Sequence, residues 1–132
     1  MNAIPYNSEA EQSVLASIII DESRYQEVNF LKPSDFWNEQ NRRIWTAIQA
    51  LDEGIDQITV AQKMKDMGTL RPERDLPHLS HIIAILPTCV HAKHYARIVQ
   101  DLSERRQQIA KAGDLAQQAY SKPIPSWKVI KT

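Results

Sequence analysis

The sequence predicts an all-α fold, and three observations support that prediction. The 132 residues include only three glycines, and the seven prolines are scattered along the chain. Apolar residues recur at intervals of three and four in successive segments, whereas strand-like alternation is not sustained anywhere. From about residue 88 to residue 120 no proline intervenes. We therefore expect a compact bundle of about five short helices followed by one long projecting helix.

The first helix is predicted within residues 5–21. Ser8 and Glu11 have the S-x-x-E spacing of a capping box, in which each side chain satisfies a free backbone N–H of the other residue. Behind this box, apolar residues recur at helical spacing: Ala10, Val14, Leu15, Ile18 and Ile19. This spacing places one apolar stripe against a core.

A second and a third helix are predicted between residues 23 and 54. Ser23 and Gln26 form another possible capping box, and we expect Pro33 to end that helix. Gly54 is a natural left-handed C-cap for the third helix. The apolar residues expected to face the core in these two segments are Tyr25, Val28, Leu31, Ile44, Trp45, Ile48 and Leu51.

A fourth and a fifth helix follow. Asp56 or Thr59 starts the fourth, and Gly68 closes it. The fifth is expected from about Leu76, with Pro77 in its first turn, to Pro87. The inward residues of these two helices are Val60, Met64, Met67, Leu79, Ile82, Ile83 and Leu86.

The last helix differs from the others in its length and in its apolar pattern. A heptad seam, interrupted by Arg105, begins with bulky residues and ends with alanines: Tyr95, Ile98, Leu102, Ile109, Ala112, Ala116 and Ala119. Packing on its own domain accounts for residues 95–102, but little chain remains to cover 109–119. The seam therefore favours one arm of an antiparallel hairpin or a dimer contact. We expect Arg105 and Arg106 to reach solvent or to pair with the acidic half of a neighbouring subunit.

Composition limits the class of protein. A chain of 132 residues suits one single-core domain, and it has no apolar run long enough for a membrane span. The single cysteine, Cys89, and the lack of a secretory signal point to a cytoplasmic protein. Residues 1–66 carry 11 acidic and 6 basic side chains, whereas residues 67–132 carry 5 and 10. Ordinary solvated faces explain this asymmetry, and electrostatic steering of assembly is the alternative.

Four motifs, in order, resemble the N-terminal domain of DnaB-type replicative DNA helicases. They are Glu9–Leu15, Phe36-Trp37 with Arg42–Trp45, Gly54–Val60 with Gly68 and Leu70, and Tyr95–Val99 with Glu104–Arg106 and Ile109. The resemblance spans residues 5–120. It departs from the family at Asn41, where a histidine is usual, and at residues 74–79, which replace a Gly-Gly and aromatic-Leu pattern. Pro123 and Pro125 also stand where the second arm of the family's C-terminal hairpin should follow.

The resemblance implies a helical head at residues 1–90, a hairpin arm at 91–120 and a tail or linker start at 121–132. It implies a non-catalytic collar domain that self-associates as a dimer, which can form part of a hexameric ring, and that docks primase or helicase-loading proteins. DNA contact is expected to be indirect or weak. The residues predicted for these interfaces are Tyr95, Ile98, Leu102, Arg105, Arg106, Ile109 and Leu115.

Two other functions stay open: a standalone regulator of helicase assembly and a weak DNA-binding module. No phosphate-binding loop of the form G-x-x-x-x-G-K-S/T is present, so we expect neither ATP hydrolysis nor a cofactor in this chain. Zinc binding by His78, His81, Cys89, His91 and His94 is the less favoured reading of those residues, and polar-face histidines are the favoured one. We expect Trp37 and Trp45 to pack in the core, and Trp127 to anchor a partner or to be disordered.

Overall fold

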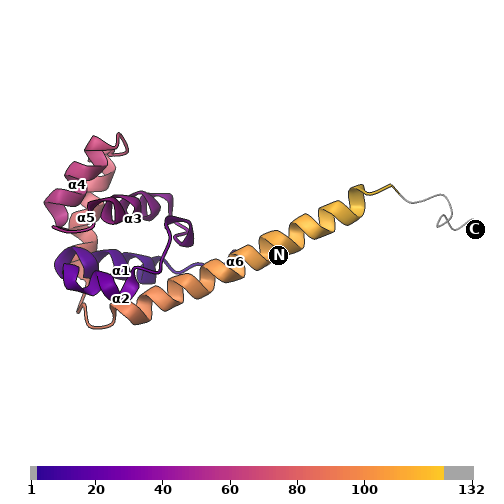
Figure 1. Ribbon diagram of the computed structural model, residues 1–132, viewed down its shortest axis with the longest axis horizontal. Coiled ribbons are helices and arrows are strands. Elements are labelled where there is room, and N and C mark those ends of the chain that lie inside the picture. Colours follow the sequence, from indigo (N-terminus) through magenta and orange to yellow (C-terminus); the bar gives the residue numbers. More distant parts are fainter. Residues whose placement is uncertain (1–2, 124–132) are drawn as a thin grey trace, which may run out of the picture.

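The computed structural model describes residues 3–123, and every regular element within that range is helical. The range contains six α-helices. The earlier ones form a head, from which the last and longest extends (Figure 1). This confirms the predicted all-α class with a long projecting helix. The elements are α1 (Ser8–Ile20), η1 (Glu22–Arg24), α2 (Tyr25–Val28), η2 (Pro33–Asp35), α3 (Glu39–Leu51), α4 (Gln57–Asp66), α5 (Pro72–Ile85) and α6 (Ala92–Ser121).

The core of the head forms around α1, which contacts α3, α5 and α6. Trp45 of α3 is fully buried, its ring centroid 5.4 Å from that of Phe36. Its indole N–H donates to the carbonyl oxygen of Leu31 at 3.0 Å, so the polar atom of this large side chain is satisfied inside the core. The largest fully buried side chains around it are Leu15, Ile18, Leu31, Ile44, Ile48, Met64, Leu79 and Ile82.

The cap of α1 differs from the predicted one. Asn7 is the N-cap, and its side-chain oxygen accepts from the N–H of Ala10 at 3.0 Å. The Ser8–Glu11 capping box was therefore wrong. Glu11 points into the head and is 2% exposed, because its carboxylate has three donors elsewhere in the chain.

The predicted ends of the second and third helices were also wrong. Asp21 accepts from the N–H of Ser23 at the start of η1, in place of the Ser23–Gln26 box. Helix α2 ends at Val28, and Pro33 begins η2 instead of ending a helix. The left-handed cap of α3 is Asp52 (φ 66°), and Gly54 takes φ 66° two residues later. These two residues turn the chain so that Ile55 enters the core.

Helix α4 begins as one of the two predicted alternatives. Asp56 is its N-cap and forms a capping box with Thr59, and Gly68 (φ 74°) follows its C-terminus. Helix α5 begins at Pro72 rather than near Leu76, which leaves Pro77 inside the helix rather than in its first turn. The earlier start places Asp75 in the first turn, where its carboxylate accepts from the backbone N–H of Arg71 at 2.8 Å.

Helix α6 packs on the head through about its first four turns, from Ala92 to Arg106. Its buried residues are Ala92, Ala96, Val99 and Ser103, a stripe one position away from the predicted heptad seam. Small side chains on this stripe allow α6 to lie close to α1 and α2. No helix among residues 3–123 is long and apolar enough to cross a membrane.

Candidate interaction surfaces

The junction between the head and the free part of α6 is held by polar contacts. Ser103 donates from Oγ to Oδ1 of Asp35 at 2.8 Å, and Oδ2 of Asp35 accepts from the backbone N–H of Lys32 at 2.8 Å. One turn later, Arg106 donates to the carbonyl oxygens of Pro5 at 3.0 Å and Asp35 at 2.7 Å. Helix α6 is therefore attached both to η2 and to the segment that precedes α1.

Arg106 was expected to reach solvent or a neighbouring subunit, and the structure gives it partners in its own chain instead. Burial lowers the pKa of its guanidinium from the ordinary value, although nearby Glu11 and Asp35 oppose that shift. Arg105, in contrast, is exposed and pairs with Asp101 of the same helix at 3.2 Å. An exposed pair of this kind contributes little stability.

The two tryptophans of the head have different environments. Core packing is confirmed for Trp45, but it was wrong for Trp37, which is 44% exposed. Trp37 stacks on Tyr6, with the ring centroids 5.9 Å apart, and the guanidinium of Arg106 lies 5.6 Å from the indole centroid. Trp37 thus covers the junction rather than filling the core. Trp127 lies outside the described residues.

A buried polar network joins α1, α3 and α5 beneath this junction. The carboxylate of Glu11 accepts from the backbone N–H groups of Trp37 at 2.7 Å and Asn38 at 3.2 Å, and from the amide of Asn41 at 3.1 Å. Because Asn41 donates to Glu11 through Nδ2, its Oδ1 faces Nε2 of His78 at 2.9 Å, and that nitrogen must carry the proton. Burial lowers the pKa of His78. The one feature of the sequence that pointed to this network is Asn41, which stands where the DnaB-type family usually has a histidine.

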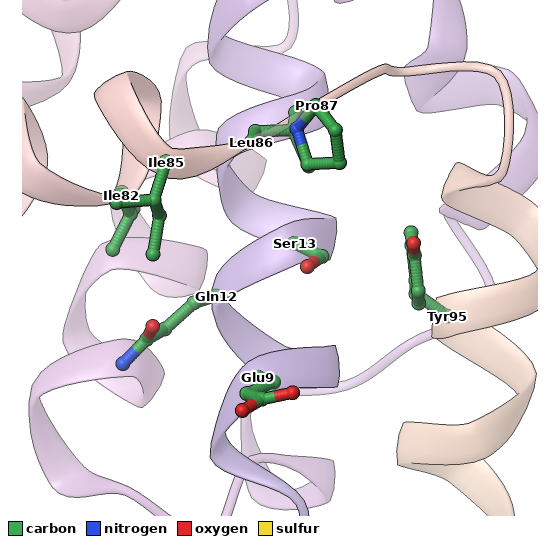
Figure 2. A pocket seen from close by; sticks show the side chains of 8 residues that line it. All are labelled: Glu9, Gln12, Ser13, Ile82, Ile85, Leu86, Pro87 and Tyr95. Carbon is green, nitrogen blue, oxygen red and sulfur yellow. The ribbon is translucent and has the colours of Figure 1, made fainter.

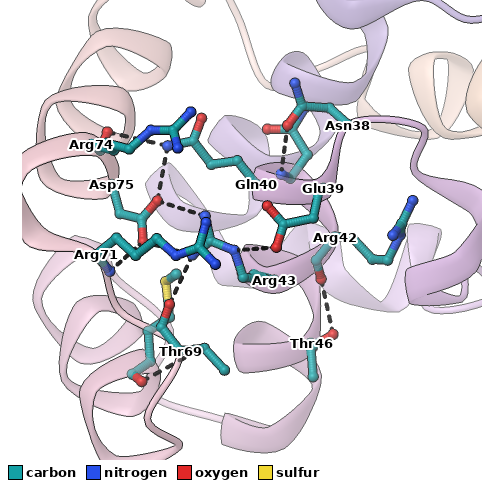
Figure 3. A network of polar contacts seen from close by, with 12 residues as sticks. Asn38, Glu39, Gln40, Arg42, Arg43, Thr46, Thr69, Arg71, Arg74 and Asp75 are labelled. Atoms are coloured by element: carbon teal, nitrogen blue, oxygen red, sulfur yellow. Dashed lines mark hydrogen bonds and ion pairs between the residues drawn. The ribbon is translucent and has the colours of Figure 1, made fainter.

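A second network fixes the start of α5 against α3 (Figure 3). Arg43 donates from two nitrogens to the carboxylate of Asp75, at 2.7 and 3.0 Å, and Gln40 donates to the same carboxylate at 2.9 Å. Burial disfavours the charged form of Asp75, but the hydrogen bonds from Arg43, Arg71 and Gln40 outweigh it and lower its pKa. Sequence analysis missed this cluster, because its members lie far apart in the chain.

The far half of α6 has no cover from the head. From residue 107 to residue 121 every side chain is exposed, and Ile109 and Leu115 keep 48% and 68% of their surface accessible. Tyr95, Ile98 and Leu102, in contrast, are half-buried at the edge of the head. Of the predicted interface residues, the structure therefore brings three to the head surface and leaves Ile109 and Leu115 on the free part of the helix.

A crevice lies between α1, α5 and the root of α6 (Figure 2). Its volume is about 290 Å³, and Tyr95 faces Ser13 across it while Ile82 and Ile85 line the far side. Glu9 and Gln12 supply polar groups at its rim. The crevice thus combines an apolar wall with an exposed carboxylate, next to the predicted residue Tyr95.

The histidines and Cys89 are separated by the fold. His78 bonds to Asn41, whereas His91 and His94 lie beside the ring of Tyr95. Within residues 3–123 no three His, Cys, Asp or Glu side chains come close enough together to hold a metal ion. His91 and His94 instead line a shallow cavity of about 320 Å³ with Lys93, Arg97 and Val90.

The sequence and the fold are similar to those of known N-terminal domains of DnaB helicases. Residues 3–101 match the family model of the DnaB-like helicase N-terminal domain. The chain is 30% identical over 122 residues to the replicative DNA helicase DnaC of Bacillus subtilis and, over the same length, 30% identical to DnaB of Geobacillus stearothermophilus. Each alignment covers 89% of this chain and 27% of the relative. The chain thus spans about a quarter of the length of these curated relatives.

Two solved structures share the fold. The N-terminal domain of DnaB helicase from Mycobacterium tuberculosis superposes with a TM-score of 0.85 at 29% identity, covering 90% of this chain and 88% of the other. The corresponding domain from Helicobacter pylori, described with its interactions with primase, has a TM-score of 0.71 at 24% identity. That match covers 85% of this chain and 90% of the other.

Proposed function

The chain belongs to the family of DnaB-like helicase N-terminal domains, and from this membership we propose that it assembles helicase subunits and docks primase. The DnaB N-terminal domain is the non-catalytic part of a replicative helicase. The observation that carries the proposal is the free part of α6, where Ile109 and Leu115 are exposed far from the head. Such side chains gain stability only by packing against another protein surface.

We propose that the first partner of this arm is a second copy of the domain. Helix α6 is 30 residues long, or about 45 Å, and only its first three to four turns touch the head. The remaining stripe contains Ala112, Ala116 and Ala119 beside the bulkier residues. Small side chains let two helices approach closely, which favours pairing between arms. Paired arms would join two heads into the repeating unit of a ring.

For primase, the support comes from the Helicobacter pylori relative, whose N-terminal domain is described with its primase interactions. The crevice of Figure 2 suits such docking, because Tyr95 and Ile85 offer apolar surface and Glu9 offers a charge at the rim. A partner that presents an apolar side chain next to a lysine or arginine would match this arrangement. We place primase there rather than on the free arm, which subunit pairing would occupy.

The test replaces Ile109 and Leu115 together with Asp. We expect dimers to disappear in sedimentation velocity while helix content by circular dichroism stays unchanged, because both side chains lie outside the head. The matched control replaces Gln108 and Gln117, exposed on the same arm, with Asp and should keep dimers. Unchanged sedimentation of the first variant would contradict the role of the arm, and loss of primase pull-down by that variant would contradict primase docking at the crevice.

A second candidate, weak DNA binding, is favoured by the cationic cavity at the root of α6. Lys93, Arg97, His91 and His94 line it without a lining carboxylate. Binding to phosphates there should fall steeply with salt, because counterions are released. Fluorescence anisotropy with single-stranded DNA at two salt concentrations tests this, and Lys93→Glu with Arg97→Glu should abolish the low-salt signal. A signal that survives both substitutions would contradict DNA binding at this cavity.

A further inference from the structure

Helices α4 and α5 lie at the end of the head away from the free part of α6 (Figure 1). The side chains of the two helices line an apolar groove. Its volume is about 330 Å³. Ile58 is 79% exposed and Leu76 is 43% exposed, which is unusual for aliphatic side chains at neighbouring positions on a surface. The lining residues are Gln57, Ile58, Ala61, Gln62, Lys65, Leu70 and Leu76.

Hydrogen bonds hold both walls of the groove in place. Arg43 binds the carboxylate of Asp75, which directly precedes Leu76, and donates to the carbonyl oxygen of Thr69 at 2.8 Å, next to Leu70 (Figure 3). Gln57 donates from Nε2 to Oγ of Ser80 at 2.9 Å and so ties α4 to α5. A groove that is already formed costs little ordering free energy when a ligand binds.

The size of the groove argues for a short segment rather than a whole domain. Its 330 Å³ is about twice the ~150 Å³ cavity that accommodates one benzene molecule, so two aliphatic side chains fit. A stable dimer of folded chains buries about 800 Å² on each partner, which a groove between two helical turns does not supply. An amphipathic helix presents two such side chains four residues apart on one face.

The charge of the residues that line the groove indicates which kind of partner helix it would bind. Lys65 is the one charged residue that lines the groove; its side chain is exposed and forms no ion pair among residues 3–123. No carboxylate lines the groove, and the nearby carboxylate of Asp66 accepts from Gln62 at 2.9 Å. The rim is therefore complementary to a negative charge.

We propose that this groove binds a short acidic amphipathic helix of a partner protein. The helix inserts two aliphatic side chains between Ile58 and Leu76 and places a carboxylate against Lys65. The site goes beyond arm pairing and primase docking at the crevice, because it uses neither α6 nor Tyr95. It also stays accessible when arms pair, since it lies at the other end of the head.

The probe is a fluorescently labelled synthetic helix with leucines four residues apart flanked by glutamates, and its control has lysines in place of the glutamates. Anisotropy with the full chain should give at least tenfold tighter binding of the acidic helix, or more than about 1.4 kcal/mol. Ile58→Ser should abolish binding, and Lys65→Glu should reverse the preference between the two helices. Lys63→Glu, partly exposed on α4 but outside the groove, should change little.

Equal binding of both helices, or binding that survives Ile58→Ser, would overturn the proposal. So would loss of dimers on Ile58→Ser, because the groove would then hold a second copy. The Ile109→Asp and Leu115→Asp variant separates the two proposals: it should lose dimers and still bind the acidic helix. If no variant and no wild-type chain binds either helix, the docking assignment fails while the arm proposal stands.

Discussion

Arg106 of α6 lies over the indole of Trp37, with its guanidinium carbon 5.6 Å from the ring centroid. The same guanidinium reaches the carbonyl oxygens of Pro5 and Asp35, so one side chain ties α6 to two separate parts of the chain, the segment before α1 and residues 35–37, at the point where α6 leaves the head. Beyond this point α6 has no further cover from the head. The direction of the arm relative to the head is therefore set at Arg106.

Arg106→Ala should lower the free energy of unfolding by about 2 kcal/mol, because two hydrogen bonds from a charged group and a cation–π contact are lost. Urea unfolding followed by circular dichroism measures this. Arg105→Ala is the control: its exposed pair with Asp101 should contribute less than about 1 kcal/mol. Equal losses for the two variants would mean that the Arg106 contacts are not formed in solution.

Glu11→Ala should be more damaging, with a loss of roughly 3 kcal/mol or more. It leaves the N–H groups of Trp37 and Asn38 and the amide of Asn41 without their acceptor in a buried site. The control is Glu9→Ala, in the same turn of α1 but exposed, which should change stability by less than about 0.5 kcal/mol. Thermal unfolding of both variants checks the expectation, and similar melting temperatures would contradict it.

Glu11 also explains why the helical fold could be predicted from the sequence while the helix caps could not. Helical spacing of apolar residues correctly identified most core positions of α1, α3, α4 and α5, since burial follows that spacing within each helix. Met67 was the exception: it was predicted to face the core, but α4 ends at Asp66 and Met67 is 40% exposed. A capping box, however, is a local pattern that competes with distant partners. Glu11 has three such partners in residues 37–41, and the nearby Asn7 caps the helix instead.

The junction between the head and α6, and the grooves on the head, could not be predicted from the sequence because they are formed by residues that are distant in the chain. Trp37 and Arg106 are separated by about half of the chain, and nothing in their local spacing indicates that they meet. The stripe of α6 that faces the head consists of Ala92, Ala96, Val99 and Ser103, whereas the heptad reading favoured the larger Tyr95 and Ile98. Large apolar side chains dominate a periodicity analysis, but close helix packing selects small ones.

Asp75→Asn should destabilise the head at neutral pH by roughly 3 kcal/mol, because it removes the charge partner of Arg43 at a buried position. The pKa of Asp75 is lowered from its ordinary value of 3.8, so its contribution is complete above that value and is lost as the pH falls through the folded-state pKa. The variant should therefore have a shallower loss of stability below about pH 4. Urea titrations at several acidic pH values measure the slope, and an unchanged slope would contradict the pairing.

His78 should make the head sensitive to mild acid. Its folded-state pKa lies below the ordinary value of 6.5 because the ring is half-buried, so the unfolded chain binds a proton that the folded head does not. The unfolding free energy should then fall as the pH drops below about 6.5 and level off below the folded-state pKa. His78→Gln can still donate to Asn41 but does not titrate, so its stability should be flatter between about pH 7 and pH 5. If His78→Gln keeps the wild-type slope, the acid sensitivity does not come from the buried network.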